Sequence, residues 1–123
     1  MNNRPMFLNL LQISFPITAI ASILHRLSGI LIFLLLPFLL YALQLTVSSE
    51  QSFQSLQKFL SINWVKFTLW GSLSAICYHL LAGIRHILMD IGLGESKCMA
   101  KISAAITILF SILLAVLIGY KLC

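Results

Sequence analysis

Three ionisable residues within and beside one apolar stretch are the best candidates for chemistry in this sequence. His79 lies inside an uncharged run, and Arg85 and His86 follow where that run ends. Ionisable groups at membrane depth are energetically costly, so each indicates a functional site. A neutral imidazole there needs a partner, and iron is a common one. His79 could therefore ligate a haem iron, or it could hydrogen-bond to a neighbouring helix, and its position alone leaves both open.

The residues that follow His79 suit a flat cofactor. Gly83, one turn further on, removes a side chain from roughly the same helical face, and His86 lies about 10 Å along that face. A haem with its iron at His79 would have its propionates near Arg85 and His86, because both side chains can donate to carboxylates. Asp90, four residues after His86, is expected to orient these side chains.

A second polar group consists of Ser22, His25, Arg26 and Gly29, which share one helical face. The Ser22 hydroxyl and the Arg26 guanidinium could bind the carbonyl oxygens of a quinone whose apolar tail stays in lipid. Alternatively, Arg26 could reach lipid head groups while its stem stays in the apolar region. Both polar groups fall at the same level of the predicted helices, so a quinone beside the propionate edge of a haem is a sensible layout for electron transfer.

Apolar composition predicts the elements that position these residues. The chain has 123 residues, of which 60% are apolar and only 9% are charged, whereas about a quarter are charged in soluble proteins. Residues 27–49, 67–84 and 102–120 are free of charge, and about 20 helical residues span a bilayer. We predict one all-α membrane domain over residues 1–123, with transmembrane helices at about 17–47, 62–91 and 101–122.

The connecting segments carry further signals. Pro37 should kink the first helix, and Gly92 and Gly94 should end the second. Apolar residues recur at helical spacing through residues 48–63 and up to Trp64, so this segment could lie in the membrane interface or could simply lead into the second helix. Residues 1–21 loosely fit a signal peptide, but polar residues interrupt its apolar part, which argues against cleavage.

Basic residues predict the orientation of the chain. An N-terminus inside the cell leaves five basic residues on the inner side and three on the outer side, which the positive-inside bias favours mildly. The inner residues are Arg4, Arg26, Arg85, Lys97 and Lys101, and the outer residues are Lys58, Lys66 and Lys121. Cys77, Cys98 and Cys123 match no metal or redox spacing, so we assign them no function.

Two stretches of the sequence resemble signatures of one protein family. Arg4-Pro5-Met6 followed by Ser22-Ile23-Leu24-His25-Arg26-Leu27-Ser28 is similar to the N-terminal signature of the cytochrome b subunit of succinate dehydrogenase. The segment from His79 through Gly83-Ile84-Arg85-His86 to Asp90-Ile91-Gly92 resembles the haem-ligand signature of that family. Chain length and the three predicted helices extend the resemblance over nearly the whole chain, although beyond Lys101 it is only hydropathic.

The resemblance implies a role for each matched residue. His79 matches the axial ligand of haem b, and Ser22 and Arg26 match residues that line the ubiquinone site. Arg85 and His86 match residues beside the haem propionates. His25 matches a histidine of the motif near the quinone site, and its role stays open.

The function implied by the resemblance is that of a membrane anchor in succinate:quinone oxidoreductase, within the respiratory chain and the tricarboxylic acid cycle. A flavoprotein subunit would oxidise succinate and pass electrons through an iron–sulfur subunit to ubiquinone. This chain has no flavin or nucleotide fingerprint and no cysteine cluster for iron–sulfur, so it cannot oxidise succinate alone. Only His79 is well placed as a ligand, so a six-coordinate haem would need a histidine from a second membrane anchor.

Two alternative functions stay open from the sequence. A non-redox membrane interaction or assembly protein would use the same polar residues for helix packing. A fumarate reductase would run the same chemistry in reverse with a different quinone. The absence of an Arg/Ser-rich transit segment favours a bacterial inner membrane over a mitochondrial one.

Overall fold

The computed structural model describes residues 17–123, and this range folds into four α-helices without a β-strand. The helices are α1 (Ile17–Ser48), α2 (Glu50–Leu60), α3 (Asn63–Asp90) and α4 (Lys97–Leu122). Residues 1–16 lie outside the described part, and with them the Arg4-Pro5-Met6 stretch, the charge of Arg4 and most of the signal-peptide alternative. The predicted all-α fold class, with three long apolar helices, is confirmed.

α1, α3 and α4 have the length and composition of membrane spans. They contain 32, 28 and 26 residues, and each includes an apolar window long enough to cross a bilayer. Their outward side chains are large and apolar: Phe33, Phe38 and Leu109 are 73%, 72% and 66% exposed. Such surfaces are stable against lipid and unstable against water, so the chain is a multi-pass membrane protein.

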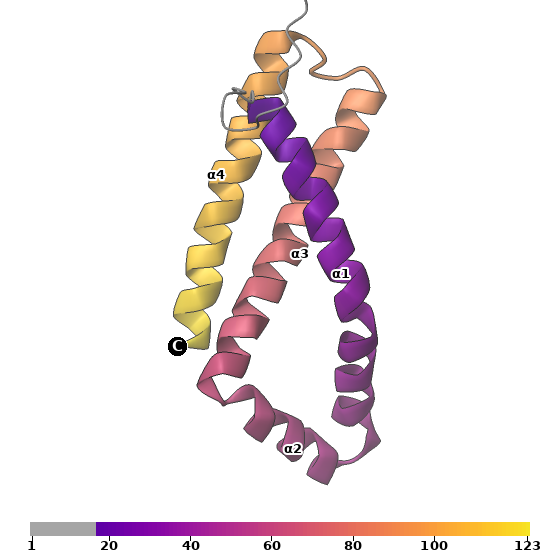
Figure 1. Ribbon diagram of the computed structural model, residues 1–123, viewed down its shortest axis with the longest axis vertical. Coiled ribbons are helices and arrows are strands. Elements are labelled where there is room, and N and C mark those ends of the chain that lie inside the picture. Colours follow the sequence, from indigo (N-terminus) through magenta and orange to yellow (C-terminus); the bar gives the residue numbers. More distant parts are fainter. Residues whose placement is uncertain (1–16) are drawn as a thin grey trace, which may run out of the picture.

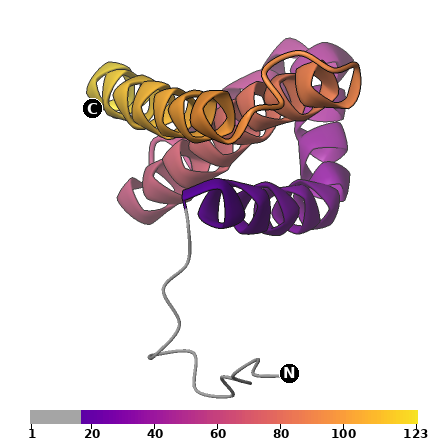
Figure 2. The ribbon, with the colours of Figure 1, turned by 90° about the horizontal axis from the view of Figure 1, so that it is seen from above.

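The three long helices do not run parallel. α1 and α3 cross, whereas α4 runs beside α3, with which it makes its most extensive contacts (Figures 1 and 2). We call the end where α1 and α4 begin and α3 ends the loop end, because residues 91–96 connect α3 to α4 there. The opposite end, where α2 joins α1 to α3, is the α2 end. α1 continues through Pro37 as a helix, and the helix axis changes direction in the half of α1 that leads to α2 (Figure 1).

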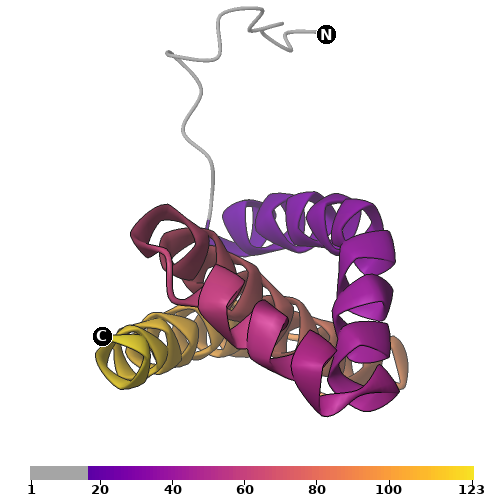
Figure 3. The ribbon, with the colours of Figure 1, turned by 90° about the horizontal axis from the view of Figure 1, so that it is seen from below.

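α2 lies across the α2 end and separates the splayed ends of α1 and α3 (Figures 1 and 3). Its first turn is closed by a reciprocal pair of bonds: the Ser52 amide donates to Ser49 Oγ at 3.0 Å, and the Ser49 amide donates to Ser52 Oγ at 3.2 Å. Ser52 Oγ also donates to the Leu45 carbonyl at 2.6 Å, which ties α2 to α1. The apolar periodicity of residues 48–63 thus belongs to a separate short helix, and its place in a membrane interface stays a prediction.

Small residues form the contacts between the long helices. The completely buried side chains are those of Ala21, Ala82 and Ala104. Within residues 17–123, no large side chain is completely buried. Alanine, glycine and serine let helix backbones approach closely in membranes, where dispersion and hydrogen bonds stabilise the contact. After α3, Gly92 and Gly94 adopt φ values of +94° and +68°, which favour glycine and allow the chain to turn back into α4.

Candidate functional site

The candidate site lies where α1 and α3 cross. Gly29 of α1 faces the His79 ring of α3 so closely that a Cβ atom on residue 29 would lie 3.1 Å from His79 Cε1. Tyr78 adds a link between the same helices, because its hydroxyl donates to the Ala21 carbonyl of α1 at 2.7 Å. The crossing therefore depends on a residue without a side chain, and it brings the backbone of α1 within hydrogen-bonding distance of His79.

Hydrogen bonds from α1 fix the orientation of the His79 ring. His79 Nδ1 lies 3.0 Å from Ser28 Oγ and 3.2 Å from the main-chain oxygen of His25. A carbonyl oxygen only accepts, and the single Ser28 hydroxyl proton is already donated to that same oxygen at 2.7 Å. His79 Nδ1 is therefore assigned as the donor to the His25 carbonyl, and in the neutral imidazole this leaves Nε2 unprotonated and able to ligate a metal.

A second imidazole packs on the first. The His25 ring stacks on the His79 ring with centroids 4.2 Å apart and planes 5° from parallel. Its other neighbour is Gly83, where a Cβ atom would come within 3.5 Å of His25 Nε2. The space that Gly83 was expected to leave for a flat ring is thus occupied by His25 in this structure.

His86 completes a cluster of three histidines. Its ring centroid lies 5.0 Å from that of His25, with the planes inclined by 55°. No group of three or more His, Cys, Asp or Glu side chains in residues 17–123 is arranged to hold a metal ion. One histidine with a free Nε2 suits a haem, because the porphyrin nitrogens supply the equatorial ligands.

Ser22 and Arg26 lie beside this cluster on α1. Ser22 is half-buried one turn before Arg26, which is exposed, and both are within one turn of His25. Neither side chain hydrogen-bonds to another residue of the described range 17–123. Their donors are therefore available to a ligand at the loop end, next to the three histidines.

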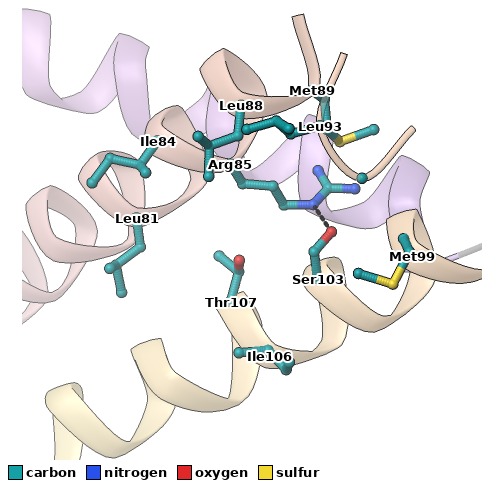
Figure 4. A pocket seen from close by; sticks show the side chains of 11 residues that line it. Leu81, Ile84, Arg85, Leu88, Met89, Leu93, Met99, Ser103, Ile106 and Thr107 are labelled. Atoms are coloured by element: carbon teal, nitrogen blue, oxygen red, sulfur yellow. Dashed lines mark hydrogen bonds between the residues drawn. The ribbon is translucent and has the colours of Figure 1, made fainter. Parts of the chain in front are cut away.

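Arg85 does not join the histidines, although its place in the sequence predicted that it would lie beside the haem propionates with His86. Its side chain is 6% exposed and points to α4, where Nε donates to Ser103 Oγ at 2.9 Å and an Nη donates to the Ala100 carbonyl at 3.1 Å (Figure 4). Six helical residues turn the chain by about 240°, so Arg85 lies about 120° around α3 from His79.

Asp90 does not orient these side chains either. It is exposed, and no hydrogen bond or ion pair joins it to Arg85 or His86.

No role was predicted from the sequence for Ser28, the residue that orients His79. One signal was present, because Ser28 follows His25 by three residues and is a hydroxyl within an apolar run. A serine there usually bonds only to its own helix. Its second bond, to a residue 51 positions away, depends on how the two helices cross.

The chain is similar to several known proteins over nearly its whole length. Residues 1–118 match the family model described as the succinate dehydrogenase/fumarate reductase transmembrane subunit. The chain is 43% identical over 117 residues to the succinate dehydrogenase cytochrome b556 subunit of Coxiella burnetii, with 94% of each chain covered. It is 34% identical over 116 residues to the subunit of the same name from Paracoccus denitrificans, covering 94% of this chain and 88% of that one. The subunit of Rickettsia typhi is 32% identical over 117 residues, covering 95% and 91%.

Proposed function

The chain belongs to the succinate dehydrogenase/fumarate reductase transmembrane subunit family, and from this premise we propose that it supplies one axial ligand of haem b and part of a ubiquinone-reduction site. Family membership makes it a membrane subunit of that complex. The observation that carries the proposal is the orientation of His79, whose Nδ1 lies within hydrogen-bonding distance of Ser28 and the His25 carbonyl of α1, which leaves Nε2 for a metal.

The hydrogen bonds of His79 fit a haem ligand, although the His25 ring occupies the space beside Gly83 and would have to move for a haem to bind there. The ligating nitrogen is oriented by two acceptors of α1, in the way that a histidine bound to a metal is normally oriented by its other nitrogen. A bound haem b would supply a one-electron carrier at this position. His86 lies on the same face of α3 near the loop end, so we assign it to a propionate. We do not assign Arg85 to a propionate, since its guanidinium bonds to α4.

We assign Ser22 and Arg26 to the quinone. Both offer hydrogen-bond donors beside the histidine cluster, and Arg26 is charged and accessible. Donors directed at a quinone carbonyl oxygen stabilise the negative charge that develops there as electrons arrive. The quinone takes up two electrons and two protons, while its apolar tail stays among the lipid-facing side chains of α1.

The proposal requires other subunits. Succinate oxidation takes place in a flavoprotein subunit, and an iron–sulfur subunit carries the electrons to the loop end. The second axial ligand comes from a second membrane anchor, because His25 is stacked on the His79 ring and His86 lies about two turns away along α3. We place the complex in the bacterial inner membrane with the N-terminus of this chain in the cytoplasm, so that the loop end faces the cytoplasm.

A reduced-minus-oxidised optical spectrum of the purified complex tests the haem ligand. We expect a b-type difference signal that His79→Leu removes, and Cys77→Ser, on the same helix, should leave it unchanged. A complex that lacks a chromophore but retains its flavoprotein would disprove the haem assignment and leave the anchor function. A b-type signal that persists unaltered in His79→Leu would show that the ligand is another residue.

Succinate-dependent reduction of ubiquinone and menaquinone analogues tests the quinone site. We expect Arg26→Leu to lower ubiquinone reduction by about 100-fold, while reduction of a water-soluble dye by the flavoprotein subunit stays at the wild-type rate. Equal losses with dye and quinone would mean that Arg26 serves assembly instead. Fumarate reduction assayed in parallel shows which direction the complex favours.

A further inference from the structure

Arg85 is a buried charge that the proposed function does not use. Its two observed acceptors, Ser103 Oγ and the Ala100 carbonyl, are neutral. The chain has only three acidic residues, Glu50, Asp90 and Glu95, and all three are exposed and form no ion pair with Arg85. A guanidinium stays charged in proteins, and a buried charge is unfavourable unless an opposite charge compensates it. No carboxylate of this chain neutralises Arg85, so a counter-ion would come from outside the chain.

A cavity of about 380 Å³ lies beside Arg85. It lies between α3 and α4 near the loop end, and the guanidinium projects into it among apolar side chains (Figure 4). Ile84, Leu88 and Ile106 line the cavity and are 48%, 43% and 59% exposed. The cavity is therefore continuous with a lipid-facing apolar surface.

Positive charge is concentrated near the end of this cavity closest to the loop. α4 begins here, with Ser96 as its N-cap, and Met99 of the first turn lines the cavity. A helix N-terminus favours anions, and the exposed Lys97 and Lys101 on the first turns of α4 add positive charge nearby. We call the cavity and the apolar surface beside it the groove. The groove thus has a cationic end and an apolar wall.

We propose that this groove binds an anionic phospholipid, with the phosphate on Arg85 and an acyl chain along Ile84, Leu88 and Ile106. A phospholipid matches both parts of the groove, because its phosphate lies at head-group depth and its tail continues into the bilayer. A carboxylate from another subunit would match only the guanidinium. The groove lies about 120° around α3 from His79, so the inference does not depend on the haem or quinone assignments.

Native mass spectrometry of the whole complex tests the proposal. The complex would be released from bilayers of phosphatidylcholine that contain a minor fraction of phosphatidylglycerol, and the lipids that stay bound would be counted. We expect phosphatidylglycerol to be retained over phosphatidylcholine by about tenfold in the wild type. Arg85→Met should abolish this preference, and Lys121→Met, at the α2 end, should not change it.

The wild-type measurement needs no variant, so absence of a preference for phosphatidylglycerol would overturn the proposal whatever the folding of Arg85→Met. Leu88→Trp keeps Arg85 and its bond to Ser103 but fills the groove, and it should also reduce retention. Undiminished retention in both variants would place the lipid elsewhere. Carbodiimide treatment of the Arg85→Lys variant tests the alternative counter-ion, a carboxylate of another subunit, because it joins a lysine amine to a carboxylate in contact with it. A cross-link to another subunit would identify a protein carboxylate as the counter-ion and exclude the lipid.

Discussion

The two faces of α3 use their polar residues differently. On the face toward α1, His79 receives its orientation through Nδ1 and keeps Nε2 free of protein partners in the described range. On the face toward α4, the Arg85 guanidinium donates hydrogen bonds to the Ser103 hydroxyl and to the Ala100 carbonyl. Both contacts join two helices, but only the first leaves a ring nitrogen for the proposed haem iron.

The difference shows that polarity within a membrane helix does not define a role by itself. His79 and Arg85 lie six residues apart, and both are costly at membrane depth. The two residues differ in the helix that each one contacts and in which of their polar atoms have no hydrogen-bond partner in the described range. Substitutions on the two faces should therefore have separable effects, on the haem signal toward α1 and on stability or lipid binding toward α4.

The substitution with the largest expected effect is Gly29→Val, which should disrupt the contact between α1 and the His79 ring. A Cβ atom on residue 29 would already lie 3.1 Å from His79 Cε1, so the added methyl groups must displace the ring or separate the helices. We expect most of the b-type difference signal to be lost. Gly71→Val is the matched control on α3, since a Cβ atom there meets nothing within 4 Å, and normal haem content in Gly29→Val would contradict the close crossing.

A finer change on the same face is Ser28→Ala. It removes one of two acceptors of the His79 Nδ1–H bond and leaves the His25 carbonyl. Loss of an outer hydrogen bond to a metal-bound histidine typically weakens metal affinity by about 10- to 100-fold. Haem transfer from the complex to an apoprotein acceptor would measure this loss, and Ser28→Thr should preserve the wild-type rate. Equal rates in wild type and Ser28→Ala would show that the carbonyl alone orients the ring.

On the α4 face, Ser103→Ala removes the acceptor of Arg85 Nε. We expect a loss of about 1 kcal/mol in the free energy of unfolding, because a bond to a charged donor is lost while the Ala100 carbonyl remains. Denaturant unfolding of the detergent-solubilised complex would measure it. The optical spectrum should not change, and a spectral shift in this variant would show that the two faces are coupled.

The smallest expected effect is that of Trp70→Phe. Trp70 Nε1 donates to the Ala115 carbonyl at 2.7 Å, far from Arg85 along the same α3–α4 contact. Hydrogen bonds between membrane helices average about 0.6 kcal/mol, so we expect a loss of that size in the same unfolding measurement. Trp64→Phe is the control, because Trp64 is 66% exposed. A loss of several kcal/mol would mean that this indole anchors α4 more strongly than Arg85 does.

Much of the fold could be predicted from the sequence because lipid imposes a simple rule. A bilayer-length run without charge has to be a helix, so the three long helices followed from composition alone. The helix α2 could not be predicted in this way, because it is too short to span a bilayer. Its stripe of Phe53, Leu56 and Leu60 suits a short helix or a turn, and the bond from Ser52 to Leu45 that docks it is a tertiary contact.

The candidate site was predictable in part. Helical spacing places His79 and His86 on one face of α3, and His25 lies near them as the matching level of the two helices suggested. Arg85 was grouped with His86 because they are adjacent in sequence, yet adjacent helical residues differ by about 100° in direction. Whether Arg85 meets the histidines or α4 is decided by helix packing, which no local pattern encodes.

The bond from His79 to α1 also has a consequence for the order of events during synthesis. Ser28 and the His25 carbonyl leave the ribosome first, and His79 follows 51 residues after Ser28. The hydrogen-bond partners of the ring lie on α1, so its orientation is fixed only after α3 has inserted and crossed α1. A haem bound as proposed would therefore be loaded only after α1 and α3 have packed together, and a chain interrupted before α3 would lack its ligand.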